Sequence, residues 1–197
     1  MDTAILGAAV INGLLLGGGY ALVAVGLTLI YGVLHIINFA HGSLLMLGMY
    51  GVYFLLVMAK IDPYAAIPLM VSVMFFAGYY LYRGVIGRFS HGKDENILLI
   101  TLGLSIVLEN IALLFFSGDS RTISVSYSDK MIELGPALVP LPKLISFAAS
   151  LLLCGLLAAF IARTDIGMAI RAVAKERQGA RLVGIDVERI FAVSYGI

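Results

Sequence analysis

Three polar side chains that could form hydrogen bonds interrupt an otherwise apolar stretch of this sequence. Residues 3–59 contain no Lys, Arg, Asp or Glu, and His35, Asn38 and His41, followed by Gly42, lie inside that stretch. Asparagine bonds backbone groups that are freed where a helix breaks, and glycine permits a close or left-handed turn. The phrase therefore predicts a hydrogen-bonded helix break, and a second hypothesis is that the break lines a path for a polar solute. The spacing of six between the histidines does not place both on one helical face, and no third ligand is near, so no metal site is expected.

Glu109 is the second candidate for chemistry. It is the only acidic residue in the apolar run from Ile97 to Phe116, where Asn110 follows it. A carboxylate inside an apolar helix usually faces the interior of a bundle and finds a donor, such as an asparagine, a tyrosine or a backbone amide. A position near the outer end of the run remains an open alternative. We group Glu109 with the break as candidate residues of a path.

The segment from Asp165 to Ile185 combines charge with an apolar face. Thr164 or Asp165 is suited to cap a helix, and Gly184 is a plausible stop. The pattern predicts one short amphipathic helix, which either lies on a membrane surface or is offered to a cytoplasmic partner. Its apolar face is expected to carry Ile166, Ile170 and Val173, and its polar face Arg171, Lys175 and Gln178.

Composition places these residues in a membrane protein. Of the 197 residues, 61% are hydrophobic and 13% are charged, and the mean hydropathy is +1.02. In a soluble domain, roughly a quarter of the residues are charged. The apolar runs are long and do not alternate every second residue, which favours helices over a barrel. The net charge of +1 gives no reason to expect nucleic acid, and the single Cys154 excludes a disulfide framework within the chain.

The elements that position these residues are all helical, and the predicted fold is an all-α polytopic transmembrane bundle with at least five spans. The last eight residues are apolar but too few to span, so we expect a sixth helix to begin there in a chain that is truncated or partly covered. The triplet at residues 17–19 is glycine, which favours close helix packing, with local unwinding as the alternative. The predicted spans are Ala4–Leu34, Leu44–Ala59, Tyr64–Ile86, Ile97–Phe116 and Leu144–Ala162.

Basic residues predict the orientation. Segments 83–95 and 163–189 hold nine of the 13 Lys and Arg, including Lys93, so both are expected in the cytoplasm. The polar segment 117–143 is then an external loop, and the N-terminus is outside if the break is a full turn. If the break is a re-entrant dip, the topology of the first two spans changes.

Two separated phrases carry a family resemblance. The first, Gly19-Tyr-Ala-Leu-Val-Ala-Val-Gly-Leu-Thr-Leu-Ile-Tyr-Gly32 followed by Ile37-Asn-Phe-Ala-His-Gly42, resembles the N-terminal signature of the LivH-type permease subunits of branched-chain amino acid ABC importers. The second, Arg171-Ala-Val-Ala-Lys-Glu-Arg-Gln-Gly-Ala-Arg-Leu-Val-Gly-Ile185, resembles the coupling loop of the same family. The two phrases occur in the expected order and the resemblance covers most of the chain.

The resemblance implies a function and a set of partners. Such permeases import branched-chain or related small amino acids across the bacterial inner membrane together with a second permease subunit, two cytoplasmic ATPase subunits and a periplasmic substrate-binding protein. The chain, read as one permease domain over residues 1–197, has no Gly-x-x-x-x-Gly-Lys-Ser/Thr phosphate loop. It is therefore expected to be non-catalytic, with ATP and Mg²⁺ bound by the partners. Segment 117–143 becomes a candidate docking surface for the binding protein. By the same resemblance, the residues that couple to the ATPase are Asp165, Gly167, Arg171, Lys175, Arg181 and Gly184.

Two other readings of the sequence stay open. An autonomous channel or secondary transporter for a small neutral solute, such as urea or an amide, is compatible with the glycine-rich helices and with Glu109. A membrane scaffold is less favoured because a scaffold has no need for a polar break. Stoichiometric ATPase subunits that copurify with the chain would separate the importer from the channel.

Overall fold

A computed structural model gives the structure of the chain and describes residues 3–90, 94–119, 121–123, 125, 127, 130–135 and 137–197. The described chain is helical apart from one short hairpin, which confirms the all-α prediction. Five of its helices are long and apolar enough to cross a membrane. In chain order the elements are α1 (Thr3–Leu34), α2 (His41–Ala59), α3 (Pro63–Leu81), the π-helix η1 (Tyr82–Ile86), α4 (Gly87–Phe89), α5 (Asp94–Phe116), β1 (Met131–Leu134), β2 (Ala137–Pro140), α6 (Leu141–Arg163), α7 (Asp165–Lys175), α8 (Arg177–Leu182) and α9 (Val187–Gly196).

The structure differs from the predicted elements in three places. The third span passes into a π turn at η1 before it ends, and the segment predicted as one amphipathic helix is divided into α7 and α8. The predicted external loop contains the antiparallel hairpin β1–β2, whose turn uses Gly135 at φ 61°. A positive φ is adopted most easily by glycine, which suits Gly135 to the turn of this hairpin. Lys93 and Asp129, to which the sequence assigned a side of the membrane, lie outside the described residues.

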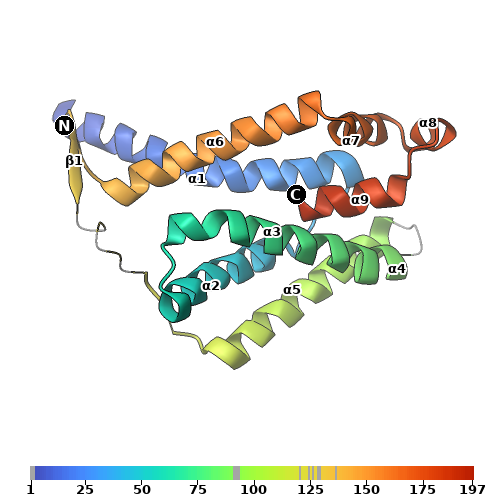
Figure 1. Ribbon diagram of the computed structural model, residues 1–197, viewed down its shortest axis with the longest axis horizontal. Coiled ribbons are helices and arrows are strands. Elements are labelled where there is room, and N and C mark those ends of the chain that lie inside the picture. The colour runs from blue at the N-terminus through green and yellow to red at the C-terminus, as the bar shows by residue number, and fades with distance from the viewer. Residues whose placement is uncertain are drawn as a thin grey trace. The chain divides into compact units, whose positions relative to one another are not determined.

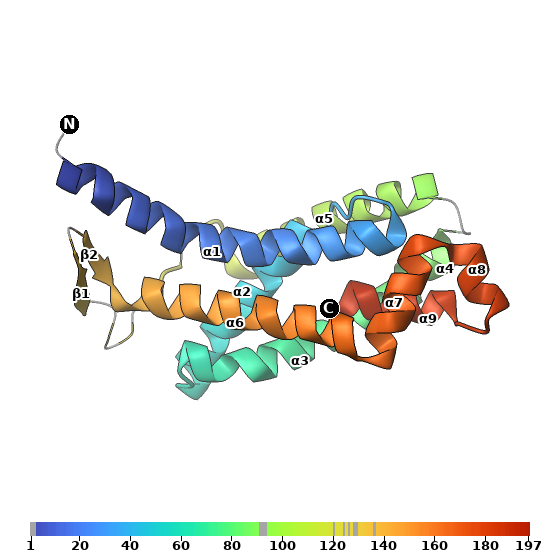
Figure 2. The same cartoon turned by 90° about the horizontal axis from the view of Figure 1, so that it is seen from above.

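The contacts divide the chain into two compact units, and the boundary falls inside α1. The first unit comprises residues 1–26 and 123–164. Its core is formed by Leu15 and Val139, with Phe147 of α6 among the side chains packed around them. Figure 2 shows the hairpin leading directly into α6.

Gly18 is the point of closest approach in this unit. A Cβ atom added to Gly18 would lie 2.4 Å from the Phe147 ring. The helix is continuous through all three glycines of residues 17–19, so the alternative of local unwinding is wrong. Glycine at this position leaves room for the Phe147 ring of α6.

The second unit comprises residues 27–122 and 165–197, and α9 packs along α3 within it (Figure 1). The two backbones meet at glycines, because a Cβ on Gly78 would lie 2.8 Å from the Tyr195 carbonyl oxygen and one on Gly196 would lie 2.7 Å from the Phe75 carbonyl oxygen. Beside this crossing the ring of Tyr82 contacts the rings of Phe191 and Tyr195, at centroid distances of 6.2 and 5.8 Å. The described residues of α9 are largely buried.

The α3–α9 crossing predicts opposite effects for two glycine-to-alanine substitutions. Gly78→Ala should destabilise the protein by about 1–3 kcal/mol, because the new methyl group meets backbone atoms that have little freedom to move. Gly103→Ala in α5 has open space around it and should be neutral or stabilising by up to about 1 kcal/mol, because alanine favours a helix. Thermal unfolding of the two purified variants in detergent measures the difference. Equal unfolding temperatures would contradict the close crossing.

Candidate functional site

The polar phrase forms the predicted break between α1 and α2. The helix α1 ends at Leu34, His35 adopts a left-handed conformation at φ 57°, and α2 begins at His41. At the centre lies Asn38, which is only 5% exposed. Its Oδ1 atom accepts hydrogen bonds from the Ala40 backbone N–H at 3.0 Å and from the Tyr195 hydroxyl of α9 at 3.1 Å. The Asn38 side chain therefore holds the break together and ties it to α9.

The other residues of the phrase have roles that differ from the prediction. The left-handed residue is His35 and not Gly42, because Gly42 lies in the first turn of α2 and has no positive φ. The His35 side chain is exposed, and the His41 N–H donates to the Asn38 carbonyl oxygen at 3.3 Å. Among the described residues, no group of three or more His, Cys, Asp or Glu is placed to hold a metal ion.

One face of α5 is polar and borders the break. Thr101, Ser105 and Glu109 are spaced by four residues, so they follow one another along a single helical face. The Thr101 hydroxyl oxygen accepts from the Phe39 N–H at 3.4 Å. Thr101 lies seven residues after the first residue of α5, or about 10 Å along it at 1.5 Å per residue. The break therefore lies beside the interior of a predicted span and not beyond its end.

Glu109 lies further along the same face and contacts two serines. Its Oε1 atom is 3.0 Å from the Ser43 Oγ atom and 2.9 Å from the Ser105 Oγ atom. The sequence predicted that Glu109 finds a donor, which these contacts confirm, but the donors are two serine hydroxyls and not the suggested asparagine, tyrosine or backbone amide. Asn110 instead donates to the Ile106 carbonyl oxygen of its own helix at 2.7 Å.

The segment expected to couple to a partner is divided at Glu176. This residue is extended, at φ −157° and ψ 106°, and its side chain accepts from the Gln178 N–H as the cap of α8. On α7 the buried residues are Gly167, Ile170 and Val173. Ile166, predicted to share that apolar face, is instead exposed, because Gly167 is the residue that turns toward the protein.

The outer surface of this segment is basic with an apolar tip. The side chains of Asp165, Arg171, Lys175 and Arg181 are exposed. At the tip Leu182 and Val183 are 88% and 76% exposed. Gly184 follows them at φ +85°, which confirms that a glycine ends the helix here. Arg181 reaches Glu188 of α9 at 3.9 Å, a pair of exposed side chains that contributes little to stability.

Arg177 joins this segment to the end of α1. Its guanidinium group donates a hydrogen bond to the Leu34 carbonyl oxygen, 143 positions away in sequence. The same group lies over the Phe191 ring, 5.2 Å from its centroid. A carbonyl at a helix C-terminus has no partner within its helix, and the helix dipole favours a cation there. Arg177 supplies both the donor and the charge.

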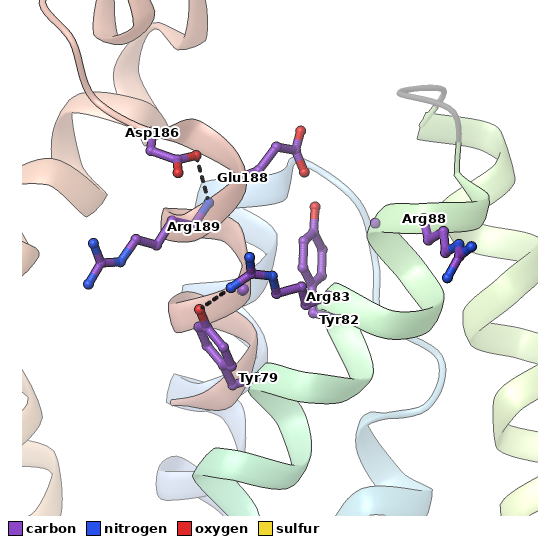
Figure 3. Close-up of a pocket in the computed structure, with 9 residues that line it drawn as sticks. Tyr79, Tyr82, Arg83, Arg88, Asp186, Glu188 and Arg189 are labelled. Carbon is purple, nitrogen blue, oxygen red and sulfur yellow. Dashed lines mark hydrogen bonds between the residues drawn. The ribbon is translucent and has the colours of Figure 1, made fainter.

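A cavity of about 600 Å³ lies between α9 and the segment from Tyr79 to Arg88. Figure 3 shows Arg83 turned to the Tyr79 hydroxyl, to which it donates at 3.3 Å, while Arg88 and Arg189 point away from each other. Asp186 and Glu188 also line the cavity. Because the arginines do not converge and carboxylates lie among them, the geometry does not favour an anion site.

Sequence reasoning missed five residues that the structure brings to the break and to Glu109. The four-residue spacing of Thr101, Ser105 and Glu109 was a usable signal, since polar residues rarely repeat at that spacing in an apolar helix. Nothing in the local sequence marked the other three, because their partners are remote in the chain. The five residues are Ser43, Thr101, Ser105, Arg177 and Tyr195.

The bond between Asn38 and Tyr195 predicts coupled effects on stability. Tyr195→Phe should cost about 0.5–1.5 kcal/mol, the net contribution of one hydrogen bond. Asn38→Ala should cost more, because it leaves the Ala40 N–H and the Tyr195 hydroxyl without this acceptor. In the double variant the loss due to Tyr195→Phe should nearly disappear, which a double-mutant cycle of unfolding free energies measures. Strict additivity would contradict the contact.

Comparison with known proteins identifies the family of the chain. Residues 9–197 match the family described as the permease component of the branched-chain amino acid transport system. The chain is 28% identical over 95% of its length to the high-affinity branched-chain amino acid transport system permease protein BraD of Pseudomonas aeruginosa, of which it covers 65%. It is 28% identical over 94% of its length to the LivH permease protein of Escherichia coli K12, of which it covers 64%.

The chain thus spans somewhat under two thirds of the length of these curated relatives. No solved structure matches it. The family match covers nearly the whole chain, and five helices long and apolar enough to span a membrane are consistent with a transport permease. The chain is a multi-pass inner-membrane protein and belongs to the family of permease components of the branched-chain amino acid transport system.

Proposed function

We propose that this chain is the non-catalytic permease subunit of an ATP-driven importer for branched-chain or related small amino acids. One observation carries the proposal beyond the family assignment. The basic segment formed by α7 and α8 is bonded through Arg177 to the Leu34 carbonyl oxygen, at the point where α1 gives way to the polar break. A surface suited to a cytoplasmic partner is thus in direct contact with the irregular backbone of the break.

A motion of α7 and α8 would reach the break along two routes. The first is Arg177, which begins α8 and binds the end of α1. The second is α9, which contacts α7 and α8 and whose Tyr195 donates to Asn38. Rigid helices joined by such bonds move as bodies and do not deform continuously. Closure of an ATPase pair on the segment would therefore change the geometry of the break.

The surface of the segment suits a protein partner. The exposed Leu182 and Val183 form an apolar tip next to the exposed basic side chains of Arg171, Lys175 and Arg181. An apolar centre with charged neighbours is the usual composition of a protein interface. The ATPase subunits would carry ATP and Mg²⁺, since this chain has no phosphate loop.

The rest of the assembly follows from the same proposal. A second permease subunit would complete the path, of which this chain contributes the break and the polar face of α5. The segment 117–143, with its hairpin, would face a periplasmic substrate-binding protein. Segments 83–95 and 163–189 would then lie in the cytoplasm, as their basic residues favour.

Arg177→Met should uncouple transport from ATP hydrolysis. Methionine retains an unbranched apolar side chain beside Phe191 but loses the donor to Leu34, so we expect amino acid uptake per ATP hydrolysed to fall about tenfold while the ATPase subunits still copurify. Uptake and ATPase activity of the complete transporter in proteoliposomes measure this ratio. Arg189→Met is the matched control, because Arg189 is an exposed arginine on the neighbouring helix α9. An unchanged ratio in Arg177→Met would contradict the coupling route.

Charge reversal on the outer surface tests docking separately. A partner surface complementary to these arginines carries acidic groups. Arg171→Glu with Arg181→Glu should therefore reduce the copurified ATPase subunits by about tenfold or more, because like charges across an interface cost several kcal/mol. Insertion of the chain should be unaffected, since both side chains are exposed. Quantitative pull-down from native membranes measures the loss. A chain that transports unaided and recruits no ATPase would instead be an autonomous channel or secondary transporter.

A further inference from the structure

Three oxygen atoms form a compact triangle between α2 and α5. The Ser43 Oγ and Ser105 Oγ atoms are 2.7 Å apart, and they lie 3.0 and 2.9 Å from the Glu109 Oε1 atom. Ser43 is 3% exposed, whereas Glu109 is exposed on the surface of this chain. The triangle is therefore closed on the side of α2 and open on the side of Glu109.

The triangle has fewer protons than contacts. Each serine hydroxyl has one proton, and Glu109 in its ionised form has none. Three oxygen–oxygen contacts within 3.0 Å therefore share two protons. If both hydroxyls donate to Glu109, then the 2.7 Å contact between the serines has no proton. With Glu109 ionised, the site has fewer hydrogen-bond donors than contacts and has unused lone pairs.

Charge leads to the same conclusion. No Lys, Arg or His in the described part of the chain forms an ion pair with Glu109. The residue lies about 5 Å past the midpoint of the span Glu95–Phe116, at 1.5 Å per residue. A carboxylate at this depth is costly in lipid and is usually turned to a polar cavity or a cationic partner. The triangle is thus complementary to a cation that carries several donors.

We propose that this triangle receives the ammonium group of the amino acid as it crosses the membrane. A primary ammonium carries a positive charge and N–H donors, and Ser43, Ser105 and Glu109 offer acceptor oxygens on its approach side. The site lies on the polar face of α5 that begins at Thr101 beside the break, which places it along the proposed path. The inference rests on the proposed function and adds to it the group of the substrate that this chain contacts.

The site would recognise the part that all amino acids share. A carboxylate with two hydroxyls selects for the ammonium, whereas the remaining neighbours on α5, such as Leu102 and Ile106, are apolar and exposed. The site therefore contributes little to the distinction between one aliphatic side chain and another. It would instead distinguish amino acids from the corresponding acids that lack nitrogen.

A cysteine reporter tests the proposal in the complete transporter. Ile106→Cys, in a Cys154→Ala background, leaves all three oxygens in place and lies three residues before Glu109 on an exposed position. We expect a small water-soluble methanethiosulfonate reagent to label it. L-Leucine and 3-methylbutylamine should slow the labelling, whereas 4-methylpentanoate, which has no ammonium group, should not.

Substitution of the acceptors should remove the protection. Glu109→Gln should weaken it at least about tenfold, which corresponds to about 1.4 kcal/mol, and Ser43→Ala with Ser105→Ala should weaken it in the same direction. Asn110→Ala is the matched control, because the Asn110 amide bonds its own helix. Leu102→Cys serves as a second reporter on the same helix if Ile106→Cys does not accumulate.

Several outcomes would overturn the proposal. Equal protection by 4-methylpentanoate would exclude ammonium recognition, and unchanged protection in Glu109→Gln would exclude this carboxylate. A cysteine that is labelled in the isolated chain but not in the assembled transporter would show that Glu109 faces a subunit interface. The proposed function fails if uptake needs no ATPase subunit, and this is a separate measurement. Protection of the cysteine by 3-methylbutylamine would still be observed in that case.

Discussion

The constraint on which the structure depends is the need to satisfy backbone groups where a helix stops inside a membrane. Water is absent from the hydrocarbon core, so each unpaired N–H or C=O group there costs several kcal/mol. The chain stops a helix at Leu34 and starts another at His41, beside the interior of α5. Every backbone N–H and C=O group freed between them needs a partner from the protein. The helices that supply these partners pack around the break in the second unit.

The partners come from remote parts of the sequence. Asn38 serves the Ala40 N–H locally, but Thr101 of α5 accepts from Phe39 and Arg177 of α8 donates to Leu34. Tyr195 of α9 then bonds Asn38 itself. The irregular backbone of the break is thereby stabilised by the same residues that connect it to α8 and α9. The stability of the break and its connection to α8 and α9 therefore depend on one set of hydrogen bonds.

The polar face of α5 extends this principle. Thr101 closes the break, and Ser105 and Glu109 continue the same face for two more turns. Leucine, isoleucine and valine cover most of the remaining surface of the helix, as lipid or a neighbouring subunit requires. A row of hydroxyl and carboxylate groups on such a helix marks the side that faces polar surroundings, because no other side of the bundle could accommodate it.

The sequence by itself determined the membrane class, the helical fold and the position of the break. Hydropathy fixed these because bilayer thickness sets the length of a span and leaves few alternatives to a helix. It also marked Asn38, Glu109 and Gly184, since an amide, a carboxylate or a glycine in an apolar context has few uses. Local pattern was less reliable at Glu176, where an extended residue with a capping side chain divides the expected helix into two.

Only the tertiary structure decided what these residues contact. Periodicity placed Ile166 with Ile170 and Val173, but packing turned Gly167 to the interior and left Ile166 exposed. Glycine adopts a left-handed conformation most easily, so Gly42 was expected to adopt it. His35 adopts it instead, because it is the first residue after α1 ends and the break begins there. Arg177 and Tyr195 gave no local signal, since a hydrogen bond over 143 or 157 positions depends on how helices meet in space and leaves no spacing in the sequence.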